Sequence, residues 1–77
     1  MNIIDGNSYL IPHKTEPERT NLVVLHKTTE GTWRFAKGAN REFFWSDDPR
    51  TTEQMASYLL ARQSENRLIP MLDNKTD

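Results

Sequence analysis

Residues 21–63 read NLVVLHKTTEGTWRFAKGANREFFWSDDPRTTEQMASYLLARQ, and this stretch decides the fold class. Its first half alternates aromatic and β-branched residues and is interrupted by two turn signals, which is typical of antiparallel strands. Its second half spaces apolar residues along one face of a helix. The stretch therefore predicts an α+β fold, in which one amphipathic helix packs on one face of a small antiparallel meander of three strands.

The first hairpin of the meander is predicted around Gly31. Residues 28–31 (TTEG) suit a type I turn in which Gly31 takes the left-handed position of a bulge. Thr28 then pairs with Thr32, which also sets Leu25 opposite Phe35. Because side chains alternate along a strand, one face of the sheet should hold Val23, Leu25, Trp33 and Phe35.

The second hairpin is predicted at residues 38–40 (GAN), with Asn40 in a left-handed conformation. In this register Phe43 lies opposite Phe35, and Trp45 lies opposite Trp33. The face that carries the first two aromatic residues therefore collects four: Trp33, Phe35, Phe43 and Trp45.

A helix is predicted from Thr51 to about Asn66. Thr51 and Gln54 have the spacing of a capping box. We interpret Asp47 and Asp48 as turn and capping residues rather than metal ligands, because no third ligand follows at the spacing of a calcium loop. The helix has an apolar stripe that should cover the aromatic face of the sheet: Met55, Ala56, Leu59 and Leu60.

Residues 1–72 are expected to form a single small domain, because one sheet and one helix account for their apolar pattern. Within it, residues 12–20 (PHKTEPERT) are polar, contain two prolines and predict a surface loop. Residues 67–72 (RLIPML) are compatible with a fourth strand at an edge, where proline is tolerated. Residues 73–77 are expected to be a disordered tail.

The composition favours a small binding protein over an enzyme. The chain has 77 residues and no cysteine, so we expect neither a disulfide scaffold nor a zinc-finger site, and a reducing cytoplasm suits it better than secretion. It contains no apolar run of the roughly 20 residues that a membrane span needs. A core this small leaves little room for a buried active site. We therefore expect no catalysis, cofactor, bound metal, small-molecule substrate or membrane contact.

The charge distribution bears on nucleic-acid binding. The net charge is −1, with −1 in residues 1–20, +3 in residues 21–41 and −3 in residues 42–77. Proteins that bind nucleic acids through many phosphates are usually clearly basic. We therefore expect at most weak or indirect binding, although a small nucleic-acid-binding module that uses the Lys27–Arg41 hairpin stays open as an alternative.

The sheet face that points away from the helix is the predicted binding surface. It should present an apolar centre with a polar rim, the composition of a protein-binding patch. An alternative is that the N-terminal segment Ile3–Ile11 covers this face. We expect His13 and His26 to be surface histidines, with partner contact as their second possible role. The predicted partner-binding residues are Leu22, Val24, His26, Arg34, Glu42 and Phe44.

The layout also resembles a known class of proteins. Three strands, NLVVLHK, TWRFAKG and REFFWSD, precede the helix TTEQMASYLLARQ in a chain without cysteine that is below 80 residues. This build resembles small phage-encoded host-takeover proteins, including those that bind bacterial RNA polymerase. The resemblance implies a regulator that docks on a host enzyme in the bacterial cytoplasm, with RNA polymerase favoured, and inhibits or redirects transcription. The alternative is an inhibitor of a nuclease-based bacterial defence complex of the anti-CRISPR type.

Overall fold

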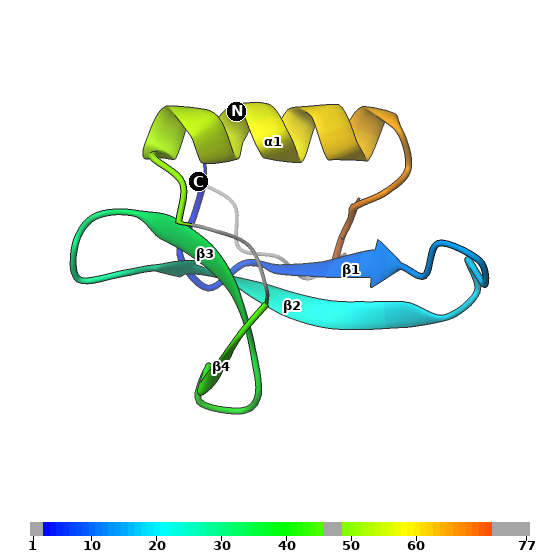
Figure 1. Cartoon of the computed structure of the whole chain (residues 1–77), viewed down its shortest axis with the longest axis horizontal. Coiled ribbons are helices and arrows are strands. Elements are labelled where there is room, and N and C mark those ends of the chain that lie inside the picture. The colour runs from blue at the N-terminus through cyan, green and yellow to red at the C-terminus, as the bar shows by residue number, and fades with distance from the viewer. Residues whose placement is uncertain (1–2, 46–48, 72–77) are drawn as a thin grey trace.

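In a computed structural model of the chain, which describes residues 3–45 and 49–71, one antiparallel sheet lies under one helix (Figure 1). The strand order in the sheet is β4-β3-β2-β1-β5. The predicted α+β class is confirmed, but the sheet has five strands rather than three or four. The elements are β1 (Ser8–Pro12), β2 (Thr20–Lys27), β3 (Trp33–Lys37), β4 (Phe43–Phe44), α1 (Thr52–Ser64) and β5 (Ile69–Pro70).

Both additional strands come from the ends of the chain. β1 pairs in the plane of the sheet with β2, so that Leu10 lies opposite Leu22. β5 pairs with β1 at the edge, where Pro70 lies opposite Tyr9 and needs no donor on its outer side. The N-terminal segment therefore extends the sheet, and the alternative that it covers the second face is wrong.

The first hairpin has the predicted register. Thr28 donates its backbone N–H to the carbonyl of Thr32 at 2.8 Å, and Leu25 pairs with Phe35. Gly31 has a φ of +86°, which glycine adopts without the steric cost that a Cβ atom would impose. The turn chemistry of residues 28–31 was thus sufficient to predict this register.

The second hairpin differs from the prediction by two residues. Ala36 pairs with Phe44 and Lys37 with Phe43, so the connection is residues 38–42 rather than 38–40. Its left-handed positions are Gly38, at φ +98°, and Arg41, at φ +57°, and not Asn40. A shift of two leaves every side chain on its predicted face, because strand side chains alternate with a period of two.

The helix begins as predicted. Thr51 accepts the backbone N–H of Gln54 on its hydroxyl, and the side chain of Gln54 accepts the N–H of Thr51, which completes the capping box. Met55 and Leu59 are fully buried against the sheet, whereas Leu60 is 61% exposed. The prediction that Leu60 belongs to the core is wrong, because the contact with the sheet is narrower than the apolar stripe.

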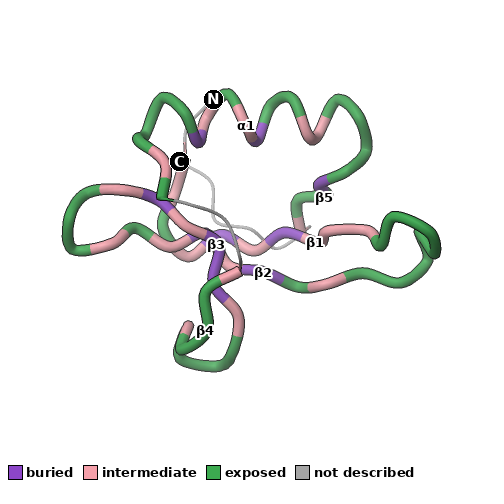
Figure 2. Tube along the Cα trace, in the orientation of Figure 1, coloured by how far each residue is buried: buried purple, intermediate pink, exposed green. Residues whose placement is uncertain are grey.

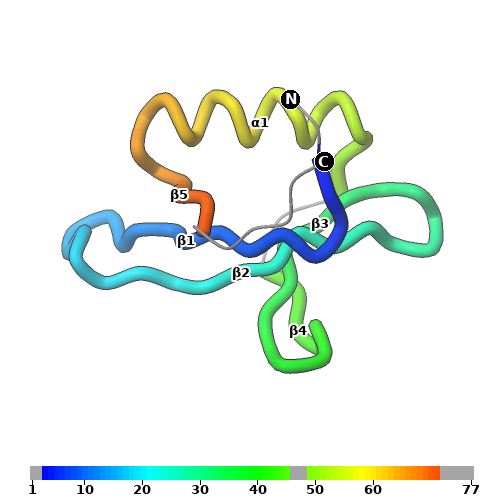
Figure 3. Tube along the Cα trace, turned by 180° about the vertical axis from the view of Figure 1, so that it is seen from behind, coloured from blue at the N-terminus to red at the C-terminus, as the bar shows by residue number. Residues whose placement is uncertain are grey.

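The core lies between α1 and the sheet. Figure 2 marks its buried positions on the helix and on the strands beneath it. Phe43, predicted to join this core, is 66% exposed. The β3–β4 hairpin projects away from the helix in both Figure 1 and Figure 3, so the side chain of Phe43 lies beyond the cover that α1 provides. The buried cluster is Tyr9, Val23, Leu25, Trp33, Phe35, Met55, Leu59 and Leu68.

Some expectations fall outside the described residues. These are the capping role of Asp47 and Asp48 and the disordered tail at 73–77. The predicted surface loop is described, and residues 13–20 are exposed. Among the described residues, no helix is long and apolar enough to cross a membrane.

Candidate functional site

The sheet face opposite α1, called here the second face, carries apolar side chains from all five strands. The pairing aligns them in two cross-strand rows, one through β5, β1 and β2 and one through β2, β3 and β4. In Figures 1 and 3, the β3–β4 hairpin projects on this side of the sheet, and no helix of the described chain covers it. Its residues are Leu10, Leu22, Val24, His26, Arg34, Ala36, Phe44 and Ile69.

The second face exposes three large apolar side chains. Leu22 of β2 is 51% exposed, Phe44 of the edge strand β4 48% and Ile69 of the opposite edge strand β5 41%, while Ala36, between Val24 and Phe44 in the second row, is fully buried. Large apolar side chains scattered singly over a surface need no explanation, but a contiguous patch with a polar rim is the signature of an interaction site. On the second face, Ile69 and Leu22 are exposed in the row through β5, β1 and β2, and Phe44 is exposed at the opposite edge of the sheet.

Phe44 is held in place by side chains of the neighbouring strands. The guanidinium carbon of Arg34 lies 4.4 Å from the centre of the Phe44 ring. The imidazole of His26 stacks on the same ring, with 5.7 Å between ring centres and 29° between planes. His26 and Arg34 are themselves cross-strand partners. The prediction that Phe44 lies beside Arg34 on this face is confirmed, and the cation–π contact fixes the orientation of a ring on a strand of two residues.

An ion-pair network supports His26 from the edge of the face. Asp5 accepts the backbone N–H of Lys27 at 2.9 Å and a guanidinium N–H of Arg41 at 2.9 Å. The same nitrogen of Arg41 lies 3.1 Å from Nδ1 of His26. Because arginine only donates hydrogen bonds, Nδ1 accepts here. The network joins the N-terminal turn, the end of β2 and the β3–β4 loop around His26.

The environment of Asp5 shifts its acidity. Burial by itself raises the pKa of Asp5, but the Lys27 backbone N–H and the charge and hydrogen bond of Arg41, with a smaller contribution from His26, hold the pKa below its ordinary value of 3.8. The native state thus binds the Asp5 proton less tightly than the unfolded chain does. The stability from this contact is present above pH 3.8 and is lost as the pH falls through the lowered pKa.

Glu42 does not lie where it was predicted. Its carboxylate accepts the backbone N–H of Asn40 at 3.2 Å, and it is close enough to Gly38 that a Cβ atom there would overlap it. The two-residue shift in register puts Phe44, instead of Glu42, opposite Ala36. Glu42 is therefore a loop residue, whereas the other five predicted residues share the second face: Leu22, Val24, His26, Arg34 and Phe44.

Four contributors to the site were not predicted from the sequence: Leu10, Ile69, Asp5 and Arg41. The sequence contained a signal for Leu10, because residues 9–11 form an apolar run, and in a strand the side chain of Leu10 points to the face opposite that of Tyr9 and Ile11. Asp5 and Arg41 had none, because they are 36 positions apart in the chain and each sits in a turn or loop.

Within residues 3–45 and 49–71, no group of three or more His, Asp or Glu side chains could hold a metal ion. His13 is exposed in the β1–β2 loop, where its Nδ1 lies 3.2 Å from the hydroxyl of Thr15.

Comparisons with models of protein families, with curated proteins and with solved structures find no match to this chain.

Proposed function

We propose that the chain is a non-enzymatic regulator that docks through its second face on a macromolecular enzyme of a bacterial host, RNA polymerase being favoured, and alters transcription. One observation carries the docking part of the proposal. The sheet is covered by a helix on one side, while its other side exposes Leu22, Ile69 and, on the edge strand β4, the already oriented ring of Phe44.

The exposed side chains supply a driving force for association. Each Å² of apolar surface removed from water contributes about 25 cal/mol, and Leu22, Phe44 and Ile69 are each two-fifths to one-half exposed. The contacts of Arg34 and His26 restrict the Phe44 ring before binding. A side chain that is already ordered loses less conformational entropy in a complex, which favours affinity.

The rim indicates the chemistry of the partner. Arg34 places a guanidinium beside the aromatic ring, and aromatic and arginine side chains are enriched among residues that dominate binding energy. A partner that fits would present an apolar ridge to Leu22 and Phe44. The choice of RNA polymerase among host enzymes is supported by the resemblance in size and layout to small phage-encoded takeover proteins.

The proposal is tested with purified components. Bacterial RNA polymerase is immobilised, binding of the chain is measured by biolayer interferometry, and a run-off assay follows transcript yield. We expect saturable one-site binding and a changed transcript yield at the same protein concentrations. An absence of binding to polymerase, together with binding to a purified CRISPR nuclease complex that blocks its cleavage, would replace the proposal by the anti-CRISPR alternative.

The nucleic-acid alternative has less support because the cations of the Lys27–Arg41 hairpin are dispersed. The amino groups of Lys27 and Lys37 lie over the rings of Trp33 and Trp45, at 5.8 and 4.8 Å from their centres. Arg34 lies over Phe44 on the opposite side of the sheet, and Arg41 pairs with Asp5. They form no continuous track for a phosphate backbone.

We therefore expect weak binding to DNA and RNA. Fluorescence anisotropy with labelled single- and double-stranded oligonucleotides at near-physiological salt should give dissociation constants no tighter than about 10⁻⁵ M, within the non-specific range. Sub-micromolar binding that weakens steeply with salt would instead identify the chain as a nucleic-acid-binding module.

A further inference from the structure

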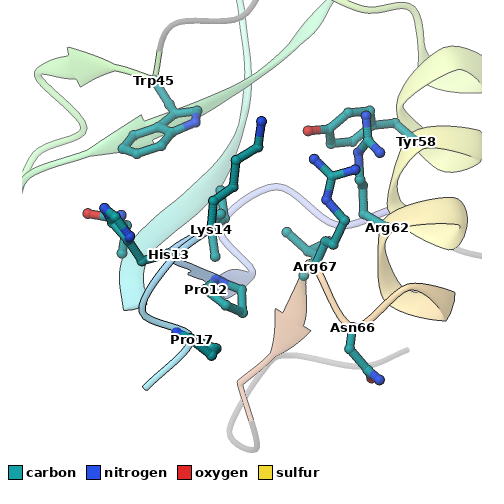
Figure 4. A pocket seen from close by; sticks show the side chains of 12 residues that line it. Pro12, His13, Lys14, Pro17, Trp45, Tyr58, Arg62, Asn66 and Arg67 are labelled. Atoms are coloured by element: carbon teal, nitrogen blue, oxygen red, sulfur yellow. The ribbon is translucent and has the colours of Figure 1, made fainter. Parts of the chain in front are cut away.

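A pocket lies on the helix side of the sheet, away from the second face (Figure 4). It has a volume of about 900 Å³ and is bounded by the end of β1 and the loop that follows it, by Trp45 after β4, and by the last turns of α1 with the segment leading to β5. Small-molecule sites in proteins commonly measure about 300–1,000 Å³. The pocket is therefore large enough for a ligand of nucleotide size.

The pocket is cationic. Its lining includes Lys14, Arg62 and Arg67, and no aspartate or glutamate of residues 3–45 and 49–71 belongs to it. The nearest carboxylate in an ion pair is that of Glu65, whose Oε1 lies 3.2 Å from Arg62 and 3.6 Å from Arg67 and offsets one of the two charges. Lys14 makes no ion pair within residues 3–45 and 49–71. Among the described residues at the cavity, positive charge therefore exceeds negative charge.

Two aromatic rings stand beside these cations. The guanidinium carbons of Arg50 and Arg62 lie 3.9 and 4.9 Å from the centre of the Tyr58 ring, which restrains Arg62 at the pocket wall. Trp45 lines the opposite wall and is half-buried. Figure 4 shows Trp45 on one side of the cavity and Tyr58, Arg62 and Arg67 on the other, with Lys14 between them.

We propose that this pocket binds a nucleoside phosphate. Arg62, Arg67 and Lys14 would bind the phosphate groups, because guanidinium groups pair with phosphate oxygens in a bidentate geometry and an ammonium adds a point charge. Lys37 lies over one face of the Trp45 indole, 4.8 Å from the ring centre, so the base would contact the other face, since stacking on an aromatic ring suits any base. The site is separate from the docking face, so it stands or falls independently of the proposed function.

A mononucleotide fits these observations better than a strand. The cations of the pocket are confined to its lining, the whole chain carries a net charge of −1, and the hairpin cations lie against rings or a carboxylate. A longer strand would therefore gain little from the hairpin cations. We expect an oligonucleotide to bind no more tightly than a mononucleotide.

The test is a titration of the full chain with ADP in magnesium-free buffer, followed by backbone amide NMR shifts. We expect saturable shifts centred on residues that line the pocket. The double variant Lys14→Ala/Arg67→Ala should weaken ADP binding at least tenfold. The matched control Arg19→Ala/Lys27→Ala removes two positive charges outside the lining and should bind ADP within twofold of the unchanged chain.

Titrations with fragments of ADP test recognition of the phosphates and recognition of the base separately. Pyrophosphate and adenosine, titrated individually, should each bind at least fivefold more weakly than ADP if both the phosphates and the ring are recognised. Pyrophosphate binding equal to that of ADP would overturn the nucleotide assignment, and equal losses in the two double variants would overturn the site. A single-stranded oligonucleotide that binds more than tenfold tighter than ADP would also overturn the mononucleotide proposal.

Discussion

Replacing Leu59 by alanine should lower the free energy of unfolding by about 2–4 kcal/mol. Leu59 is fully buried in the cluster between α1 and the sheet, so truncation removes apolar contacts and leaves a cavity. Domains of this size have a total stability of only about 5 kcal/mol or somewhat more. Urea denaturation followed by tryptophan fluorescence measures the loss, because buried Trp33 belongs to the same cluster.

The adjacent leucine provides the control. Leu60 is 61% exposed, and exposed substitutions usually change stability by no more than about 0.5 kcal/mol. Leu60→Ala also leaves a good helix former in place. Equal losses for the two variants, or none for Leu59→Ala, would show that α1 does not present Leu59 to the sheet.

Local signals were enough to predict the first hairpin and the helix start. The residues that fix each structure are close in sequence: Thr28 and Thr32 close one turn, and Thr51 and Gln54 cap one helix. Such contacts depend little on the rest of the chain. The α+β class followed from them together with the alternation of β2 and β3.

The register of the second hairpin depends on a contact that the local sequence does not contain. Arg41 occupies a left-handed conformation, at φ +57°, which is uncommon for a residue with a side chain. Its guanidinium is held by Asp5, at 2.9 Å. A local reading of GAN preferred Asn40 at that position. The tertiary ion pair accompanies a longer loop, and no pattern within residues 38–42 indicates it.

The faces of the strands were easier to predict than the extent of the core. The alternation of side chains along a strand assigned Phe44 and Arg34 correctly to the second face, because a register shift of two residues leaves each side chain on the same face. Burial of Phe43 and Leu60 depended instead on how far α1 extends over the sheet. That overlap is set by the path of the chain through all five strands, and β1 and β5 pair with residues distant in sequence.

Two neighbouring phenylalanines provide a test variant and a matched control for the proposed docking face. Phe43 and Phe44 are adjacent in β4 and point to opposite sides of the sheet. Both are substantially exposed, Phe43 at 66% and Phe44 at 48%. The two rings are therefore matched in residue type, strand and accessibility, and they differ in the surface to which they belong.

Replacing Phe44 by alanine should weaken binding to RNA polymerase by about 2 kcal/mol or more, which is roughly a 30-fold rise in the dissociation constant. The ring lies on the edge strand β4, is 48% exposed, and is oriented by Arg34 and His26. Phe43→Ala should bind nearly as the unchanged chain does, and both variants should melt close to it. Polymerase binding that survives Phe44→Ala while the melting temperature falls sharply would make Phe44 a structural residue. The docking surface would then have to lie elsewhere, in the exposed loop between β1 and β2 or at the chain ends, because the second face loses its oriented aromatic ring without Phe44.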